Sequence, residues 1–252
     1  MPLMFDIIPA IDLMGGCVVR LTRGDPKLKT VYNHDALAVA KRWDQSGVRW
    51  LHVVDLDGAF TGSYRNFSLA KAIIKRVKAK VELSGGIRTM EAAEQGLEIG
   101  AARIILGTKA CEEPDFVRRA VERFGGDRVA VAIDARGTQA TTSGWVRSSG
   151  RSALELAKEM TDFGVETLVV TDVTRDGTLS GPNLSLLEQI MEVTKASVIA
   201  SGGISSHSDL ESLNDLARRG LIGAIVGKAL YEGRIDLAKA LRVKHPTKRR
   251  AR

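Results

Sequence analysis

The chain has few of the residues that characterise disulfide-bonded, zinc-binding or membrane-spanning proteins. Of its 252 residues only two are cysteines, Cys17 and Cys111, and 5% are aromatic. Two cysteines so far apart form neither a disulfide framework nor the paired spacing of a zinc site, which is typical of the reducing cytosol. No apolar run reaches the about 20 residues that a membrane-spanning helix needs, and the N-terminus lacks the basic start of a signal peptide. The sequence therefore predicts a cytoplasmic protein without a membrane segment.

Several catalytic motifs are also missing. The four histidines form no HxxxH pattern, the cysteines form no CxxC, and neither a G-x-S-x-G nor a G-x-G-x-x-G loop is present. These absences disfavour metal, flavin, nicotinamide and covalent serine or cysteine chemistry, so we expect neither a cofactor nor a metal ion. His52 lies inside an apolar segment, and we interpret it as a packed side chain rather than a catalytic one.

The net charge of +7 is concentrated at one end of the chain. Five of the excess positive charges lie within 244–252, which contains no acidic residue, and we interpret this segment as a disordered basic tail. With few aromatic residues and no recognition motif, nucleic-acid binding is disfavoured. The mildly basic remainder suits a phosphorylated small-molecule substrate instead.

Short β-rich apolar segments alternate with amphipathic ones along the chain. Several of them are apolar at consecutive positions, as parallel strands buried on both faces are. Eight such alternations predict a closed parallel barrel or a large open sheet. The expected strands are 5–11, 49–55, 80–84, 102–106, 128–134, 166–171, 197–201 and 222–226. The expected helices are 35–47, 66–78, 89–99, 113–124, 152–163, 184–194, 207–217 and 234–242.

An internal repeat favours the closed barrel. VELSGGIR at 81–88 returns as VIASGGIS at 198–205, and LHVVDLDG at 51–58 returns within LVVTDVTRDG at 168–177, both 117 residues later. Two further strand ends, IIPAIDL and IILGTKA, return as VAVAIDA and AIVGKAL. Four matches in the same order at nearly constant spacing indicate two similar halves of one structure.

The repeat predicts a single α/β domain, a (β/α)8 TIM barrel over residues 1–243 built from two (β/α)4 halves of about 1–125 and 126–243. Active sites of such barrels lie at the C-terminal strand ends, where every repeated motif falls. The segments 13–34 and 135–151 after the first and fifth strands are long, as loops that cover a substrate are. No apolar arm for subunit contact is evident, so we expect a monomer.

Glycines follow the expected strands at symmetric positions. They allow backbone N–H groups to approach an anion, and a following helix N-terminus adds a partial positive charge. One Gly-Gly pair alone indicates a turn, but two pairs related by the repeat predict two phosphate sites at one barrel mouth. The ligand should therefore carry a phosphate at each end. The expected phosphate-binding residues are Gly85, Gly86, Gly107, Thr108, Gly177, Gly202, Gly203, Gly227 and Lys228.

Aspartates end the first strand of each expected half. Asp12 and Asp134 occupy symmetric positions and fit an acid/base pair in which burial and mutual repulsion raise one pKa. Thr171 ends the sixth strand, where it can hydrogen-bond substrate or orient a carboxylate, and Asp176 lies in the adjacent loop. Asp55 is a weaker candidate that can fix the barrel rim instead.

Taken together, these residues resemble the ProFAR isomerases, barrel enzymes of histidine biosynthesis that act on phosphoribosylformimino-5-aminoimidazole carboxamide ribotide. The resemblance runs through IIPAIDL, VVRLTRGD, LHVVDLDGAF, VELSGGIR, LGTKA, VAIDARG, SGW, TDVTRDGTLSGPN, ASGGISS and GAIVGKALYEG, and only the basic tail lies outside it. It implies an Amadori rearrangement, from aminoaldose to aminoketose, on a substrate with two phosphates and without a cofactor.

The resemblance also assigns roles to single residues. It implies that Asp134 protonates the ribose ring oxygen, that Asp12 removes the C2 proton, and that Thr171 supports these transfers. Arg20 in VVRL is similar to the family's loop-one substrate contact, and Trp145 in SGW to its loop-five stacking residue. The glycine pairs match the family's two phosphate sites.

Several alternatives remain open. VELSGGIR and DGTLSGPN are also similar to dual-substrate actinobacterial isomerases, which additionally act on phosphoribosylanthranilate in tryptophan synthesis. Those enzymes place an arginine two residues before the loop-five tryptophan, where this chain has Ser143, so we expect the second activity to be weak or absent. The cyclase subunit of imidazole glycerol phosphate synthase shares the repeat and both aspartates but needs a glutaminase partner. A catalytically silent phosphate-binding barrel is a further alternative.

Overall fold

A computed structural model of the chain describes residues 5–142 and 147–242. Ser143 and Trp145, which the sequence places in loop five, lie outside the described residues, and so does the basic segment 244–252. No helix within the described residues combines the length and the apolar character that crossing a membrane requires.

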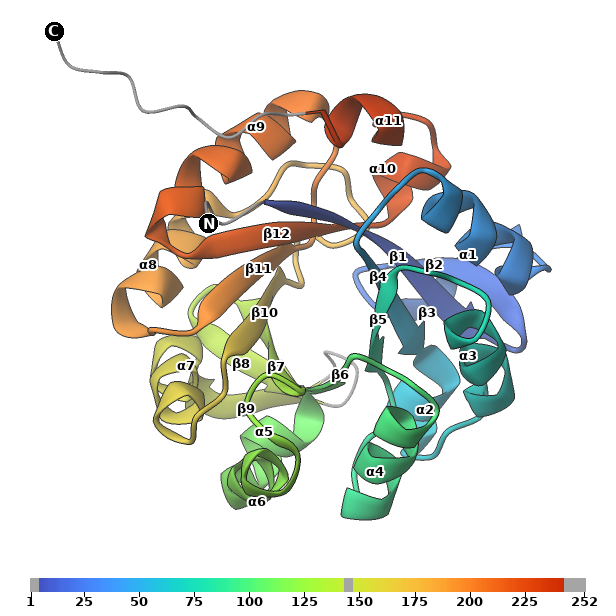
Figure 1. Cartoon of the computed structure of the whole chain (residues 1–252). Coiled ribbons are helices and arrows are strands. Elements are labelled where there is room, and N and C mark those ends of the chain that lie inside the picture. The colour runs from blue at the N-terminus through green and yellow to red at the C-terminus, as the bar shows by residue number, and fades with distance from the viewer. Residues whose placement is uncertain (1–4, 143–146, 243–252) are drawn as a thin grey trace, which may run out of the picture.

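Eight parallel strands form the closed barrel that the repeat predicts, with helices around its outside (Figure 1). Neighbouring strands are hydrogen-bonded in the order β10-β11-β12-β1-β4-β5-β6-β7, and β7 pairs with β10 to close the ring. Each lies close to an expected strand. Their bounds are β1 (Asp6–Met14), β4 (Trp50–Asp55), β5 (Lys80–Ser84), β6 (Arg103–Leu106), β7 (Val129–Arg136), β10 (Thr167–Asp172), β11 (Ser197–Ser201) and β12 (Leu221–Val226).

Antiparallel hairpins extend the first strand of each half. The long segments after β1 and β7, expected as loops, contain β2 (Cys17–Thr22) with β3 (Asp25–Asn33), and β8 (Gln139–Thr142) with β9 (Arg147–Ser152). Gly15 and Gly16 both have positive φ, as a two-residue hairpin turn requires. Because β3 is mostly exposed and polar, its sequence lacks the alternating pattern of a half-buried strand.

Helices follow the barrel strands as expected, although the last is shorter than its predicted range. The longer helices are α1 (Ala36–Gln45), α3 (Phe67–Ile74), α4 (Met90–Glu98), α6 (Pro114–Phe124), α7 (Ala153–Asp162), α8 (Leu184–Val193) and α9 (His207–Asp215). Short helical turns are α2 (Leu56–Thr61), α5 (Thr108–Glu112), α10 (Lys228–Tyr231), α11 (Leu237–Ala240) and the 3-10 turn η1 (Leu216–Arg219). Helix α9 begins with a capping box, in which Ser206 and Asp209 each bond the other's backbone N–H.

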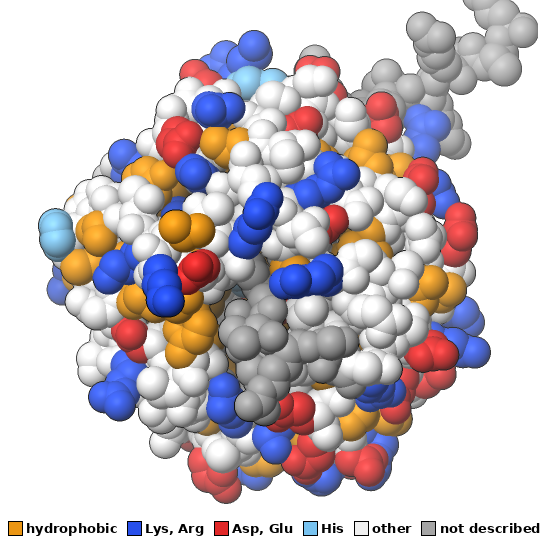
Figure 2. Space-filling model, turned by 180° about the vertical axis from the view of Figure 1, so that it is seen from behind, with side chains coloured by type: hydrophobic (Ala, Val, Ile, Leu, Met, Phe, Trp, Pro, Cys, Tyr) orange, Lys and Arg blue, Asp and Glu red, His pale blue; other side chains and the backbone are white. Residues whose placement is uncertain are grey.

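Side chains of each barrel strand alternate between two cores. On β1, Ile11 and Leu13 belong to the large core between strands and helices, whereas Ala10 belongs to the smaller core inside the barrel. The same alternation places Asp12 inside the barrel at the end of β1, and Asp134 inside it at the end of β7. Strand geometry therefore directs both carboxylates toward the barrel axis. Figure 2 shows the face opposite to that of Figure 1, with Lys and Arg side chains near its middle and both signs of charge around its edge.

Matching aspartate–asparagine pairs fix the rim in the two halves. Asp55 accepts hydrogen bonds from the backbone N–H groups of Gly58, Arg65 and Asn66, and from the Asn66 amide at 2.7 Å. Asp172 and Asn183, each 117 residues further on, form the equivalent side-chain bond, also at 2.7 Å. The interpretation of Asp55 as a rim residue is thereby confirmed.

Candidate active site

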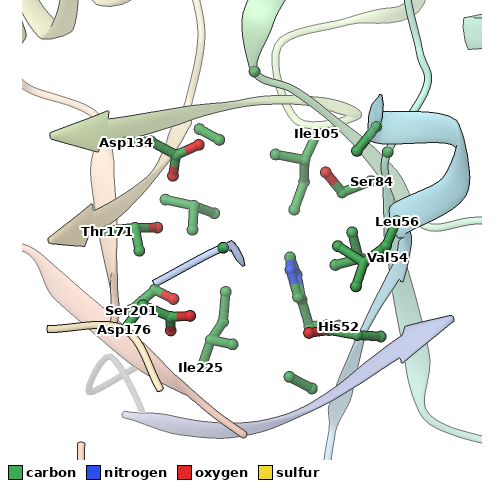
Figure 3. Close-up of a pocket in the computed structure, with 18 of the residues that line it drawn as sticks. His52, Val54, Leu56, Ser84, Ile105, Asp134, Thr171, Asp176, Ser201 and Ile225 are labelled. Atoms are coloured by element: carbon green, nitrogen blue, oxygen red, sulfur yellow. The ribbon is translucent and has the colours of Figure 1, made fainter. Parts of the chain in front are cut away.

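A cavity opens where the C-terminal ends of the barrel strands meet, and side chains from both halves line it. Asp12 reaches it from β1 and Asp134 from β7. Figure 3 shows Asp134, Thr171 and Asp176 on one side of this cavity and His52 on the other. The structure thus brings the predicted acid/base residues to one place.

Thr171 lies beside Asp134 because β10 pairs with β7. The two residues are register partners in this pairing, and Thr171 is also the register partner of Ser201 on β11. Thr171 is buried and its side chain faces the cavity. Its position suits the predicted role of bonding a substrate or orienting a carboxylate.

Arg20 lies between two carboxylates of the cavity, those of Asp12 and Asp176. The β1–β2 hairpin carries it over the barrel mouth, where its Nη1 donates to Asp12 Oδ2 at 2.8 Å and its Nη2 lies 3.7 Å from Asp176 Oδ1. The guanidinium is buried directly against Gly227: a Cβ added to that glycine lies only 2.3 Å from Arg20 Cζ. Gly227 therefore makes room for the arginine.

Asp176 has an altered proton affinity. Burial raises the pKa of Asp176 to about 6, and the charges of Asp12 and Asp134 add to this rise while Arg20 opposes it. Sequence reasoning placed Asp176 in the substrate-binding set and sought the raised pKa in the aspartate pair. The sequence does not show this shift because it depends on burial behind Arg20.

The raised pKa of Asp176 predicts a pH-dependent gain in stability for Asp176→Asn. Its folded-state pKa lies above its ordinary value of 3.8, so the stability that protonation provides is complete below about pH 4 and is lost as the pH rises through about 6. At pH 8 the variant should therefore be more stable than wild type by about 1–3 kcal/mol, at about 1.4 kcal/mol per pKa unit. Urea denaturation at pH 4.5 and pH 8 measures this difference.

Asp172→Asn is the matched control with the opposite sign. Although burial raises the pKa of Asp172, hydrogen bonds from Thr174 and Asn183 outweigh it and hold that pKa below its usual value. Its ionised form therefore stabilises the fold, and this contribution is lost as the pH falls through the depressed pKa. Asp172→Asn should lower stability at pH 8. A gain in both variants, or a gain for Asp176→Asn that is the same at both pH values, would contradict the assignment.

The nine predicted phosphate-binding residues lie in two neighbouring hollows. The four predicted residues of the first half line the main cavity, and the five of the second half line a smaller hollow beside it. The two hollows share Arg20, Asp176, Ser201 and Ile225. The main cavity contains Gly85, Gly86, Gly107 and Thr108. The smaller hollow contains Gly177, Gly202, Gly203, Gly227 and Lys228.

Close backbone contacts explain why two of these positions require glycine. Gly85 has a φ of +92°, and an added Cβ would lie 2.1 Å from the Asp55 carbonyl oxygen. Gly203 has a φ of +79°, and its Cβ would lie 2.3 Å from the Gly181 carbonyl oxygen. The glycines therefore shape the loops that surround each hollow, whatever ligand occupies it.

Sequence reasoning missed four polar residues of the cavity, one of which is Arg88. Ser84 and Ser201 both line it, and each precedes a Gly-Gly pair at symmetric positions 117 residues apart. The repeat contained this signal. His52, interpreted as a packed residue, lines the cavity as well. The repeat provides no signal for His52, because its counterpart is Val169.

The fold and this site define a (β/α)8-barrel protein with a carboxylate-lined cavity and two glycine-rich hollows at the mouth. Within the described residues, no group of three or more His, Cys, Asp or Glu side chains is placed to hold a metal ion. The family model described as "Histidine biosynthesis protein" matches residues 6–236. The chain belongs to this family.

Curated relatives match nearly the whole chain. A protein of Symbiobacterium thermophilum is 48% identical over 94% of this chain and 95% of its own length. Proteins of Gloeobacter violaceus (46% identical, 96% of this chain and 95% of that protein) and Paenarthrobacter aurescens (45%, 95% and 96%) are similar as well. Each is named a 1-(5-phosphoribosyl)-5-((5-phosphoribosylamino)methylideneamino)imidazole-4-carboxamide isomerase.

Proposed function

We propose that this protein is an aldose–ketose isomerase that converts ProFAR to its ribulosyl isomer, PRFAR, in histidine biosynthesis. The observation that carries the proposal is that Asp12 and Asp134 line one cavity from opposite halves of the barrel. The relatives are named for an isomerase of the same bisphosphorylated compound. We expect the protein to act in the cytoplasm as a monomer, without a cofactor, a metal ion, nucleic acid or a membrane.

The proposed reaction is an Amadori rearrangement driven by acid/base catalysis. Asp134 donates a proton to the ribose ring oxygen, the C1–O bond breaks, and the ring opens to an iminium ion. Asp12 removes the C2 proton to give an enolamine, which becomes the aminoketose when C1 gains a proton and the C2 hydroxyl loses its own. Pairs of carboxyl groups held in different environments can divide acid and base roles in this way.

Neighbouring residues hold the reacting groups in position. Arg20 fixes the Asp12 carboxylate through its 2.8 Å hydrogen bond, and Thr171 stands beside Asp134. Asp176 is held near Arg20 and contributes to substrate binding. The hollow around Gly85 and the hollow lined by Lys228 accept the two phosphates. The family resemblance implies that Trp145, which lies outside the described residues, stacks on the substrate.

Gly227→Ala should lower the catalytic efficiency of the protein toward ProFAR. The added Cβ displaces the Arg20 guanidinium and breaks its hydrogen bond to Asp12. Because a hydrogen bond to a charged group contributes about 1.5–3 kcal/mol, we expect kcat/KM to fall about 10- to 100-fold. At the counterpart position Gly107, the nearest side-chain atom lies 3.8 Å from an added Cβ, so Gly107→Ala should cost less. Equal losses in steady-state assays of the two variants would contradict this account of Gly227.

Substrate specificity is tested by assaying ProFAR and phosphoribosylanthranilate in parallel. Because Ser143 replaces the arginine that meets the anthranilate carboxylate, we expect turnover of ProFAR and weak or no turnover of phosphoribosylanthranilate. Ser143→Arg is the informative variant and should raise the second activity. Comparable turnover of both substrates by the unmodified chain would show that it is a dual-substrate isomerase. Turnover of neither would overturn the isomerase proposal and favour the cyclase.

A further inference from the structure

A buried charged network lies inside the first half of the barrel, below the cavity. Glu82 is 0% exposed; its Oε1 lies 2.7 Å from His52 Nδ1, and its Oε2 accepts from Arg103 Nε at 2.9 Å. Arg103 also donates to Thr167 and stacks on the Trp50 ring, with Cζ 4.2 Å from the ring centroid. The network ends at His52, which lines the cavity.

The second half of the barrel has no such network at the equivalent positions. His52 and Glu82 correspond to Val169 and Ile199, each 117 residues later, and both of these belong to the apolar core inside the barrel. Arg103 corresponds to Gly223, 120 residues later. The same spacing separates Gly107 and Gly227, which follow the same two strands. Because apolar residues complete the same fold there, the barrel does not need the charged network. Buried ion pairs contribute little net stability compared with well-packed apolar residues, so their presence calls for another reason.

The hydrogen bonds of Glu82 determine which nitrogen of His52 carries a proton. Burial raises the pKa of Glu82, but hydrogen bonds from His52 and Arg103 and the positive charge of Arg103 outweigh it and hold that pKa below its usual value. An ionised carboxylate only accepts hydrogen bonds, so His52 Nδ1 must be the donor. In a neutral ring this leaves Nε2 as an acceptor, for which the described part of the chain provides no hydrogen-bond partner. Figure 3 shows the ring directed into the cavity.

We propose that Arg103 and Glu82 are positioning residues that hold His52 in its Nδ1–H form, so that Nε2 accepts a hydrogen bond from a hydroxyl or amino group of the substrate at the cavity floor. Around this floor the barrel strands contribute Ala10, Ile105, Ala132 and Val169, which have no polar side-chain atom. His52 therefore provides the hydrogen-bond acceptor in this part of the site. The inference rests on the proposed function for the identity of the substrate, ProFAR.

The tautomer of His52 can be measured without turnover. In the full chain with 15N-labelled imidazole rings, we expect the His52 signals to show a protonated Nδ1 and an unprotonated Nε2 at pH 8. In Glu82→Gln the amide can accept from or donate to Nδ1, so the two tautomers should mix. A wild-type ring protonated at Nε2, or a tautomer ratio that Glu82→Gln leaves unchanged, would overturn the proposal whether or not the protein is an isomerase.

A double-mutant cycle tests whether Glu82 acts through His52. We expect Glu82→Gln and His52→Phe each to lower kcat/KM for ProFAR about 10- to 100-fold, as loss of one hydrogen bond at a reacting substrate does. In the His52→Phe background, Glu82→Gln should have no further effect. Equal effects in both backgrounds would show that Glu82 has only a structural role. Ile199→Val, the counterpart of Glu82, is the control and should leave activity within about twofold.

A second variant keeps the test valid if Glu82→Gln fails to fold with Arg103 unpaired. Glu82→Ile with Arg103→Met removes the whole ion pair and gives this position the apolar character of the second half. We expect this double variant to unfold cooperatively at a temperature close to that of wild type, to lose the fixed His52 tautomer, and to retain only about a tenth or less of the ProFAR activity. Full activity in a folded double variant would overturn the proposal. If wild type itself fails to turn over ProFAR, the proposed function is wrong, and the tautomer measurement alone decides the positioning role.

Discussion

Asp12→Asn and Asp134→Asn should each lower kcat/KM for ProFAR by about 10²- to 10⁴-fold, the usual contribution of a positioned general acid or base. Both side chains line the cavity, and asparagine keeps their shape while removing the ability to exchange a proton at catalytic pH. The loss should appear mainly in kcat, because the hollows that receive the phosphates are unchanged. Steady-state assays with matched thermal denaturation curves measure both effects.

The control for this prediction is a carboxylate in the first turn of α2 that lies outside the cavity. Asp57 accepts hydrogen bonds from the Gly15 N–H and the Asn66 amide and does not line either hollow. Asp57→Asn should therefore change kcat/KM by no more than a few-fold. Near-normal activity in folded Asp12→Asn or Asp134→Asn would remove that residue from the mechanism. Activity in both would favour a barrel in which the carboxylates only bind substrate.

The largest stability effect is expected from Asp55→Ala. Asp55 is 1% exposed and accepts four hydrogen bonds, three of them from backbone N–H groups that its removal would leave unpaired. Breaking such a buried charged group's contacts costs about 3–5 kcal/mol, out of the about 5–15 kcal/mol by which a typical domain is stable. The variant should show a correspondingly lower urea midpoint with little change in the denaturant slope.

An exposed aspartate provides the comparison. The side chain of Asp115 is 66% exposed and forms only a surface pair with Arg118 in the described structure, so Asp115→Ala should change the free energy of unfolding by about 0.5 kcal/mol or less. Asp172→Ala, at the equivalent rim position of the second half, should resemble Asp55→Ala in direction. A loss below about 1 kcal/mol for Asp55→Ala would show that the rim rearranges without it.

The internal repeat made the barrel and most of its cavity predictable from sequence. Strand ends that recur 117 to 122 residues apart mark where the chain meets the barrel mouth, and strand alternation directs Asp12 and Asp134 inward. Parallel strands buried on both faces are recognisable because their apolar positions are consecutive. The fold was therefore predictable where the sequence pattern reflects burial.

Features that depend on a single half, or on contacts between distant segments, were not predictable in this way. The polar strand β3 is held by pairing with β2 rather than by an apolar pattern. His52 lines the cavity and is hydrogen-bonded to Glu82, whereas the corresponding residues of the second half, Val169 and Ile199, are apolar. The repeat therefore gives no signal for His52. The raised pKa of Asp176 arises from burial beside Arg20, a contact that only the folded hairpin creates.

The most direct test of the central claim is to incubate the purified chain with ProFAR and to follow the ribosyl C1 and C2 positions by NMR. The proposed mechanism predicts loss of the C2 proton signal and appearance of the ketose carbonyl at C2 of PRFAR, catalytically and in buffer without added cofactor. Both changes should be abolished in Asp12→Asn and Asp134→Asn. Unchanged ProFAR, or a product in which the C2 proton is retained, would contradict the assignment of this cavity as an aldose–ketose isomerase site.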